Sequence, residues 1–457
     1  NVLIYERIRE ELSAGKNMKQ ALKDGYGNAM SAIIDANVTT ILTGIILAYF
    51  GTGPIKGFAT TLIIGILCSL LTAIFVSRLI FDLYSKSEGF EKLTFSTKLS
   101  ENWFKNVKFD FIGKSKPYLM AAFGVIIVAI VSLFAIGLQQ GIDFSGGRNY
   151  TVKFEKDVTT GEVKDLLDNA FDGANASVIT IGSADQVRIS TNFRIHDTED
   201  DVDADIESRL YNSLKPILNN GVSEDMFVNR YVVNDGVASL ADAQSEVTYG
   251  IQSSQKVGPT MADDIKISAV IAVLIAMLGI GLYIFLRFSR IAYSGGALLA
   301  LAHDTLFILL LYCILPLTGV VPFSLEVDQS FIAAILTVIG YSINDKVVIF
   351  DRIREFIHNR KGADFNKQDV FNSAISSTLS RTFSTSLSTL IVLVIIFFFG
   401  GETIRGFIFA MLIGVIVGTY SSIFIAAPFA CKYYSAKADE EEEAKRIEKE
   451  KRLAERA

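Results

Sequence analysis

The sequence has few of the residues that most often carry catalysis or bind metals. It contains three cysteines and three histidines in 457 residues. Cys68, Cys313 and Cys431 lie in or beside apolar runs, and an odd set of this kind excludes a disulfide framework and a cysteine-based metal site. His196 has no recognisable nucleophile beside it, so a solvated loop histidine is the better interpretation. Without a nucleophile–base pair, metal-ligand spacing or phosphate-binding loop, we expect no enzyme activity, bound metal or cofactor.

Apolar residues are abundant instead. They make up half of the chain, and the mean hydropathy of +0.38 is too high for an ordinary soluble protein of this size. Runs of about 18 apolar residues or more can cross a bilayer. Such runs lie at roughly 35–50, 57–84, 118–138, 268–286, 293–315, 329–350 and 384–430. The last run is broken at 400–403 and therefore contains two helices, so the seven runs predict eight full spans. Residues 1–5 resemble the end of a further helix, whose beginning we expect to precede residue 1.

The distribution of lysine and arginine predicts how these spans are oriented. Basic residues gather in alternate segments: 7–24, 86–116, 287–290, 352–367 and 432–452. The links 51–56, 316–328 and 400–405 are nearly free of them. Since basic loops stay in the cytoplasm, the alternation places segment 139–266 outside. We therefore expect a multi-pass membrane protein with 139–266 on the non-cytoplasmic side.

Segment 139–266 has the pattern of a globular domain. Strand-like alternation at 149–154 is followed by an amphipathic helix at 160–171 and two strands at 176–181 and 186–190. A second amphipathic helix at 201–218 and a strand at 226–233 complete the order β-α-β-β-α-β. This order predicts an α+β domain with a ferredoxin-like fold.

Two segments near the expected cytoplasmic face are rich in charge. Segment 87–117 interleaves Phe95, Trp103, Phe104, Phe109 and Phe111 with lysines, which suits either a strip on the membrane surface or an ordinary linker. Residues 436–457 alternate glutamate with lysine and arginine at helical spacing, which predicts a solvated helix and not a binding site.

The start of the chain recurs near its end. Residues 1–10 match residues 346–355, and residues 51–58 match residues 400–407. Each copy has a helix end, a basic loop, a helix, a tight turn and another helix. Duplicated membrane halves place their functional site at the interface between the repeats, near the bilayer midplane.

These motifs, in this order, resemble the SecD/SecF protein-export family of the resistance-nodulation-division superfamily. Residues 1–11, 35–40 and 51–58 are similar to the end of SecD, and 141–147 is similar to the signature after the first SecF helix. Residues 257–259 and 340–345, with Arg381 and Thr382, are similar to later SecF motifs. The family commonly has a small hydroxylated residue where this chain has Lys346, and its aspartate in the fourth SecD helix would lie just before residue 1.

The resemblance implies a fused SecDF arrangement in a polytopic α-helical membrane protein. Its helices would form two inverted repeat halves of the type found in this superfamily, with one α+β ferredoxin-like periplasmic domain. The implied division is SecD-like helices at 1–86, an interfacial linker at 87–117, a first SecF-like helix at 118–138, the periplasmic domain at 139–266, five further helices at 267–431 and a charged tail at 432–457. The motif residues with an implied structural role are Gly141, Asp143, Gly146, Gly147, Gly340, Asn344 and Arg352.

The resemblance also implies partners and a function. Proton flow would help the Sec translocon pull unfolded exported polypeptide across the inner membrane. The implied partners are the translocon channel complex, a membrane insertase, a small accessory subunit and protons, with no nucleic acid.

Ionisable residues inside the predicted spans are the candidate relay. Asp345 lies about 15 residues into its helix, where a charge costs a few kcal/mol and therefore marks function by default. A carboxyl group in such surroundings can exchange protons near neutral pH. The alternative is a structural aspartate satisfied by neighbours such as Asn344, Lys346 or Ser342.

Three further residues could serve the relay. Arg381 starts the next apolar run and would act as a permanent positive partner of Asp345, or else extend to the membrane interface. Asp35 occupies nearly the corresponding place in the first repeat, where it would pair across the repeats or cap its helix. Asp304 follows His303, which can titrate near neutral pH and so could serve a relay. A local hydrogen-bonded network explains the pair nearly as well as a relay role does.

Two other functions compete with proton-driven export. A small-molecule or lipid exporter of the same superfamily would usually carry larger external domains. A passive scaffold for the translocon or insertase would not need the intramembrane charges of Asp345 and Arg381.

Overall fold

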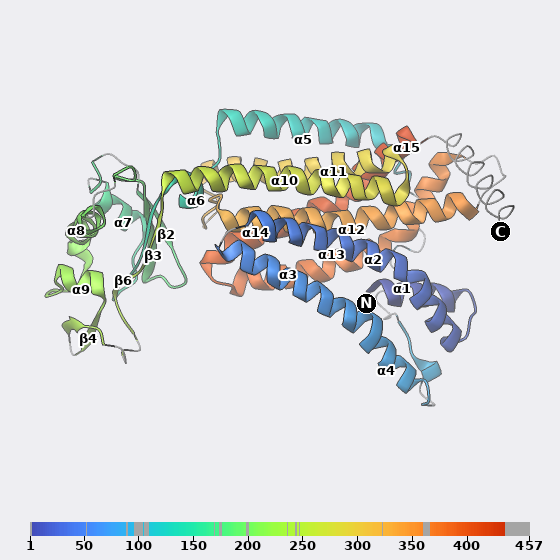
Figure 1. Ribbon diagram of the computed structural model, residues 1–457, viewed down its shortest axis with the longest axis horizontal. Coiled ribbons are helices and arrows are strands. Elements are labelled where there is room, and N and C mark those ends of the chain that lie inside the picture. Colours follow the sequence, from blue (N-terminus) through green and yellow to red (C-terminus); the bar gives the residue numbers. More distant parts are fainter. Residues whose placement is uncertain are drawn as a thin grey trace, which may run out of the picture.

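The computed structural model describes residues 2–51, 53–87, 90–95, 104, 109–168, 170–172, 176–197, 201–234, 236–242, 245, 247–321, 323–359 and 366–434. Within these ranges, eight helices are long and apolar enough to cross a membrane, as the sequence predicts. They form an elongated bundle, and a small α+β domain projects from one end (Figure 1). The predicted helix at 436–457 and Trp103 lie outside the described residues.

The bundle opens with the short helix α1 (Val2–Ser13). The spanning helices follow in this order: α2 (Met18–Phe50), α3 (Gly53–Leu71) continued by η1 (Thr72–Val76) and α4 (Ser77–Tyr84), α5 (Ser115–Ala135), α10 (Pro259–Phe288), α11 (Ile291–Thr318), α12 (Gln329–Asn359), α13 (Lys367–Phe399), and α14 (Glu402–Ser421) continued by η4 (Ser422–Ala426) and α15 (Ala427–Tyr433). Helix α2 begins well before the apolar run 35–50, because its first turns bury Leu22 and Tyr26 against α1.

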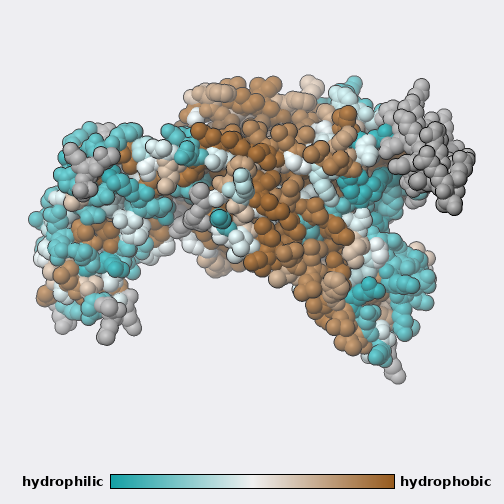
Figure 2. All heavy atoms as spheres, in the orientation of Figure 1, coloured by the Kyte–Doolittle hydropathy of each residue, from teal (hydrophilic) through white to brown (hydrophobic). Residues whose placement is uncertain are grey.

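An apolar surface surrounds the bundle. Figure 2 shows a hydrophobic belt between hydrophilic surfaces at the two ends of the molecule. Large exposed side chains such as Leu67 in α3 and Leu278 in α10 contribute to it. A patch of this size is unfavourable in water and matches the hydrocarbon core of a bilayer. The chain is therefore a multi-pass membrane protein.

The projecting domain contains a four-stranded antiparallel sheet in the order β2-β3-β1-β6. Its elements are β1 (Gly147–Lys153), α7 (Thr160–Leu167), β2 (Ala176–Thr180), β3 (Gln186–Thr191), α8 (Val202–Leu214) and β6 (Gly250–Val257). One face of the sheet buries alternate residues such as Val152, Val187 and Ile189 against Ile206 and Leu210 of α8. The predicted ferredoxin-like fold is confirmed.

The predicted last strand of this domain is wrong. Most of 226–233 belongs to helix α9 (Glu224–Asn229) and to β4 (Tyr231–Asn234), which forms a separate hairpin with β5 (Val237–Leu240). Ser223 caps α9 by accepting a hydrogen bond from the Met226 amide, and two acidic residues in the first turn favour the helix. The sheet is completed by β6, which leads directly into α10.

The two repeats are built alike and run in the same direction. The unit α2–α3–α4 corresponds to α13–α14–α15, and each contains a π-helical turn, η1 or η4, at nearly the same place. The turns that join the helices lie together, since the Phe58 and Phe407 rings are 5.6 Å apart. The basic ends also lie together, joined by ion pairs between α1 and α12. The prediction of inverted halves is therefore wrong, because equivalent helices are parallel.

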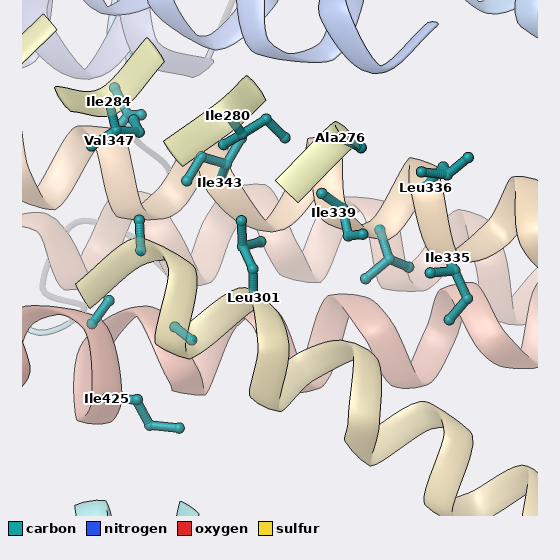
Figure 3. Packing of buried hydrophobic residues seen from close by; sticks show 14 of the residues in the cluster. Ala276, Ile280, Ile284, Leu301, Ile335, Leu336, Ile339, Ile343, Val347 and Ile425 are labelled. Atoms are coloured by element: carbon teal, nitrogen blue, oxygen red, sulfur yellow. The ribbon is translucent and has the colours of Figure 1, made fainter. Parts of the chain in front are cut away.

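Helix α12 lies at the centre of the bundle, in contact with α2, α10, α11, α13 and α14. Residues at helical spacing on one face, including Ile339, Ile343 and Val347, pack against α10 (Figure 3). Ile280 and Ile284 of α10 lie opposite them (Figure 3). Helix α12 thus contacts both α13 and α14, the two helices that follow it in the chain.

The aromatic strip of segment 87–117 packs partly against the bundle. The rings of Phe109 and Phe111 contact Phe424, and the ring of Phe104 lies 5.3 Å from Phe383. Phe111 is almost completely buried. These contacts hold the described part of the segment against the basic end of the bundle.

Candidate functional site

Asp345 faces the interior of the bundle and not the lipid. Only 6 % of its surface is exposed, although it lies in the middle of a membrane-spanning helix. The positive charge of Arg381 on α13 acts on its carboxylate, and Ser386 of the same helix lies close to it. The structure therefore brings together the two residues that the sequence ranked highest for the relay.

Arg381 is half-buried between three helices. Its guanidinium interacts with the carboxylates of Asp345 and Asp351 on α12 and with Glu6 on α1. It does not extend to the bundle surface as a lone interfacial arginine would. One permanent positive charge thus faces several carboxylates at the seam between the repeats.

Asp304 belongs to a separate buried network on the other side of α12. Its Oδ2 accepts hydrogen bonds from Ser342 Oγ at 2.7 Å, Ser421 Oγ at 2.9 Å and Lys346 Nζ at 3.0 Å. Its Oδ1 lies 3.3 Å from His303 Nδ1, and all these groups are almost fully buried. The geometry favours the alternative of a local network, in which Lys346 neutralises Asp304 and not Asp345.

Asp35 pairs across the two halves and does not cap a helix. It lies in the middle of α2, where its Oδ2 accepts from Arg287 Nε of α10 at 2.7 Å. Its Oδ1 accepts from the Tyr283 hydroxyl at 2.8 Å. Arg287 also donates to Ser31 Oγ at 2.6 Å. Asp35 thus has its own arginine, which also lies 3.8 Å from Asp351, a carboxylate that faces Arg381.

Arg352 joins a reciprocal set of ion pairs between the repeats. It lies 3.2 Å from Glu10 of α1, while Arg7 of α1 lies 3.3 Å from Glu355 of α12. Each arginine also pairs with the glutamate of its own helix, at 2.7 Å and 2.9 Å. The internal repeat aligns Arg7 with Arg352 and Glu10 with Glu355, so the arrangement follows the approximate symmetry of the two halves.

The sequence reasoning did not single out Glu6, Glu10 or Arg287 as site residues. The signal for the first two was present, because the repeat aligns residues 6–10 with residues 351–355 next to the candidate site. In the sequence, Arg287 is only one of the basic residues of segment 287–290, and nothing local connects it with Asp35.

The glycine-rich segment 141–147 anchors the α+β domain to α12. Gln140 and Val327 form an isolated parallel bridge, and the Gly141 amide donates to the Val327 carbonyl at 3.0 Å. Asp143 Oδ2 accepts from the Gln329 amide at 3.2 Å, so it caps the N-terminus of the helix that carries Asp345.

The paired glycines of this segment are required by close approach. Gly146 and Gly147 both have positive φ. A Cβ at Gly147 would lie 2.8 Å from the Thr191 carbonyl oxygen, and a Cβ at Gly146 would lie 3.4 Å from Pro259. The segment can therefore turn sharply into β1 only with glycine at these positions.

Gly340 and Asn344 lie on α12 near the same seam. Gly340 lets α12 approach α2, since a Cβ would lie 3.1 Å from Thr43 Oγ1. Asn344 Oδ1 is buried and has no hydrogen-bond partner among the described residues. No group of three histidine, cysteine, aspartate or glutamate side chains suited to a metal ion occurs in the part of the chain that the structure describes.

Comparison with protein-family models decides the family. A model described as "Protein export membrane protein SecD/SecF, C-terminal" matches residues 1–87 and 238–436. A second, described as "SecD/SecF GG Motif", matches residues 131–158, which contain the glycine-rich anchor. The chain belongs to the SecD/SecF family of protein export membrane proteins.

Curated members of the SecD/SecF family align over most of the chain. Protein translocase subunit SecDF of Bacillus subtilis is 31% identical over 450 residues, which cover 93% of this chain and 54% of the relative. Protein translocase subunit SecF of Rhodothermus marinus is 36% identical over 326 residues, covering 71% of this chain and 93% of the relative. The chain spans about half the length of the SecDF relatives that it matches.

The fold is also similar to a solved SecDF structure. The crystal structure of SecDF from Thermus thermophilus, described as a translocon-associated membrane protein, superposes with a TM-score of 0.74 at 29% identity. The match covers 94% of this chain and 52% of that chain. The arrangement of membrane helices and α+β domain is thus one that the family is known to adopt.

Proposed function

We propose that this chain is part of a Sec translocon accessory protein that uses the proton gradient to promote protein translocation. The observation that carries the proposal is that the opposite charges of Asp345 and Arg381 act on each other inside the bundle, at the seam of the two repeats. Family membership and the described relatives, which are translocase subunits, support the export role.

The pair can act as a proton-controlled unit. When Asp345 is ionised, its attraction to Arg381 favours close contact between α12 and α13. When Asp345 takes up a proton, that attraction is lost, because an arginine keeps its charge at every physiological pH. The two helices can then separate.

The energy available from the gradient matches this task. One elementary charge that crosses the membrane yields about 2.3 kcal/mol per 100 mV. Shifting a two-state equilibrium from one conformer to the other takes up to about 5.5 kcal/mol, which a few protons supply. Since Asp143 caps α12, a displacement of this helix would be transmitted to the root of the α+β domain.

The proposal extends to location and partners. The belt in Figure 2 and the basic end of the bundle support an inner-membrane protein with the α+β domain in the periplasm. There the domain would hold emerging unfolded polypeptide. The translocon channel, the membrane insertase and a small accessory subunit remain the proposed partners, and Asp35 and Asp304 remain proposed secondary members of the relay.

The experiment compares Asp345→Asn with Asp369→Asn in inverted membrane vesicles under an imposed proton gradient. Asp369 is exposed in the first turn of α13 and serves as the matched control. Asp345→Asn should accumulate in the membrane normally but lose the gradient-dependent part of preprotein translocation, and Arg381→Met should do the same. Full gradient-dependent translocation by Asp345→Asn would contradict the relay and favour a passive scaffold.

A further inference from the structure

Arg381 faces a second carboxylate that the proposed relay does not use, namely Glu6 of α1. Glu6 Oε1 accepts from Arg9 at 3.3 Å, and the Glu6 side chain is 12% exposed. Its other oxygen, Oε2, is buried and has no hydrogen-bond partner among the described residues. A buried carboxyl oxygen without a hydrogen-bond partner costs free energy, so its retention needs an explanation.

A small cavity connects Glu6 with Arg381. Its volume is about 20 Å³, which is room for roughly one water molecule. Ala32 and Thr378 also line it. The repeat aligns Ala32 of α2 with Arg381 of α13, so a small side chain in the first half leaves space for the guanidinium of the second.

Asp351 also faces Arg381, but it is already occupied. It lies 2.9 Å from Arg354 and 3.8 Å from Arg287. Glu6 by contrast lines the cavity and keeps one oxygen without a hydrogen-bond partner among the described residues. The other charged groups of the cavity wall, Arg7, Glu10 and Arg352, are engaged in the reciprocal ion pairs.

We propose that Glu6 is a positioning residue that receives Arg381 when Asp345 is protonated. This inference rests on the proposed relay function. While Asp345 is ionised, the guanidinium is shared between a carboxylate deeper in the bundle and Glu6 nearer the basic end. Once a proton binds the Asp345 carboxylate, the attraction to Glu6 remains and draws the guanidinium towards the cavity. Arg381 loses no proton in this step, and the only bond formed is the O–H bond on Asp345.

The test uses Glu6→Gln in vesicles of the native membrane with an imposed proton gradient. Glutamine keeps the length of the side chain and an oxygen for Arg9, but it carries no charge to attract Arg381. Gradient-dependent translocation should fall about tenfold, within the usual range for coupled sites. Glu6→Asp restores the charge and should retain translocation. The matched control is Glu11→Gln on the same helix, whose carboxylate pairs with Lys16 at 2.6 Å and does not line the cavity.

Three outcomes separate the inference from the function on which it rests. The inference is supported if Glu6→Gln lowers gradient-dependent translocation while Glu6→Asp retains it. It also requires that adding Glu6→Gln to Asp345→Asn lowers translocation no further. Full activity of Glu6→Gln beside an inactive Asp345→Asn overturns the role of Glu6 and leaves the relay standing. Full activity of both variants overturns the relay and the inference together.

A second variant protects the test against misfolding. If Glu6→Gln does not accumulate in the membrane, Ala32→Val fills the same cavity while every charge is kept. The same loss of gradient-dependent translocation is expected, and normal translocation by Ala32→Val at normal membrane levels would overturn the proposal.

Discussion

Lys346 Nζ lies 3.0 Å from Asp304 Oδ2, although Asp345 is its neighbour in the sequence. Successive residues of an α-helix point about 100° apart, so α12 presents Asp345 to α13 and Lys346 to α11 and α14. Lys346 therefore has its own counter-ion. Asp345 is left to interact with Arg381, as a relay requires.

Removing Lys346 should destabilise the protein through its partner Asp304. Lys346→Met leaves Asp304 charged and buried, which is expected to cost about 3–5 kcal/mol. Thermal unfolding in detergent measures this, with the exposed Lys19→Met as control. The double variant Asp304→Asn with Lys346→Met should be less destabilised than Lys346→Met alone. An equal or larger loss in the double variant would contradict the ion pair.

The reciprocal ion pairs should couple the two repeats. A double-mutant cycle with Arg7→Gln and Glu355→Gln is expected to give an interaction energy of about 1 kcal/mol, because the pair joins two helices in a partly buried network. The matched cycle with Arg354 and Asp351, which pair at 2.9 Å within α12, should give only about 0.2–0.5 kcal/mol. Thermal unfolding at low and high salt measures both, and a smaller coupling for the pair between helices would refute the prediction.

Gly340 should be intolerant of a side chain. A Cβ there would lie 3.1 Å from Thr43 Oγ1, so Gly340→Val would force α12 away from α2 at a cost of about 1–3 kcal/mol. Gly124→Val in α5 is the control, since nothing lies within 4 Å of a Cβ at that position. The melting temperature in detergent should fall for Gly340→Val only. Equal shifts would show that helix propensity, and not close packing, governs both sites.

The junction between the α+β domain and α12 should respond to pH. Burial and the nearby carboxylates of Asp143 and Glu326 raise the pKa of Asp328 from 3.8 to about 6, while burial also raises the pKa of Glu326. A carboxyl group whose pKa is raised by folding contributes most stability at low pH, and this contribution is lost as the pH rises through about 6. The junction should therefore be tighter at pH 5 than at pH 7.5.

Hydrogen exchange of segments 139–145 and 324–331 measures this, after correction for the intrinsic pH dependence of exchange. Asp328→Asn keeps an acceptor for the Phe331 amide, which now donates to Asp328 Oδ1 at 2.8 Å. This variant should reduce the difference between the two pH values. An unchanged difference in Asp328→Asn would assign the response to another group.

Much of the fold was predictable because its signals are local. The length of an apolar run and the basic residues beside it determine a membrane span and its orientation, whatever the rest of the chain does. The β-α-β-β-α-β order was also readable from periodicity. The exception was the last strand, since β6 pairs with β1 about 100 residues away and a capped short helix occupies the predicted place.

By itself, the sequence determined that Asp345 lies deep in a membrane span, that Arg381 starts the next one and that the two halves are copies. Only the tertiary structure decided the partners: Lys346 for Asp304, Arg287 for Asp35, and Glu6 beside Arg381. The physical reason is that the rotation of each helix about its axis, and the neighbour it meets, depend on packing across the whole bundle. A charge in the sequence shows that a partner is needed, and the packing determines which residue it is.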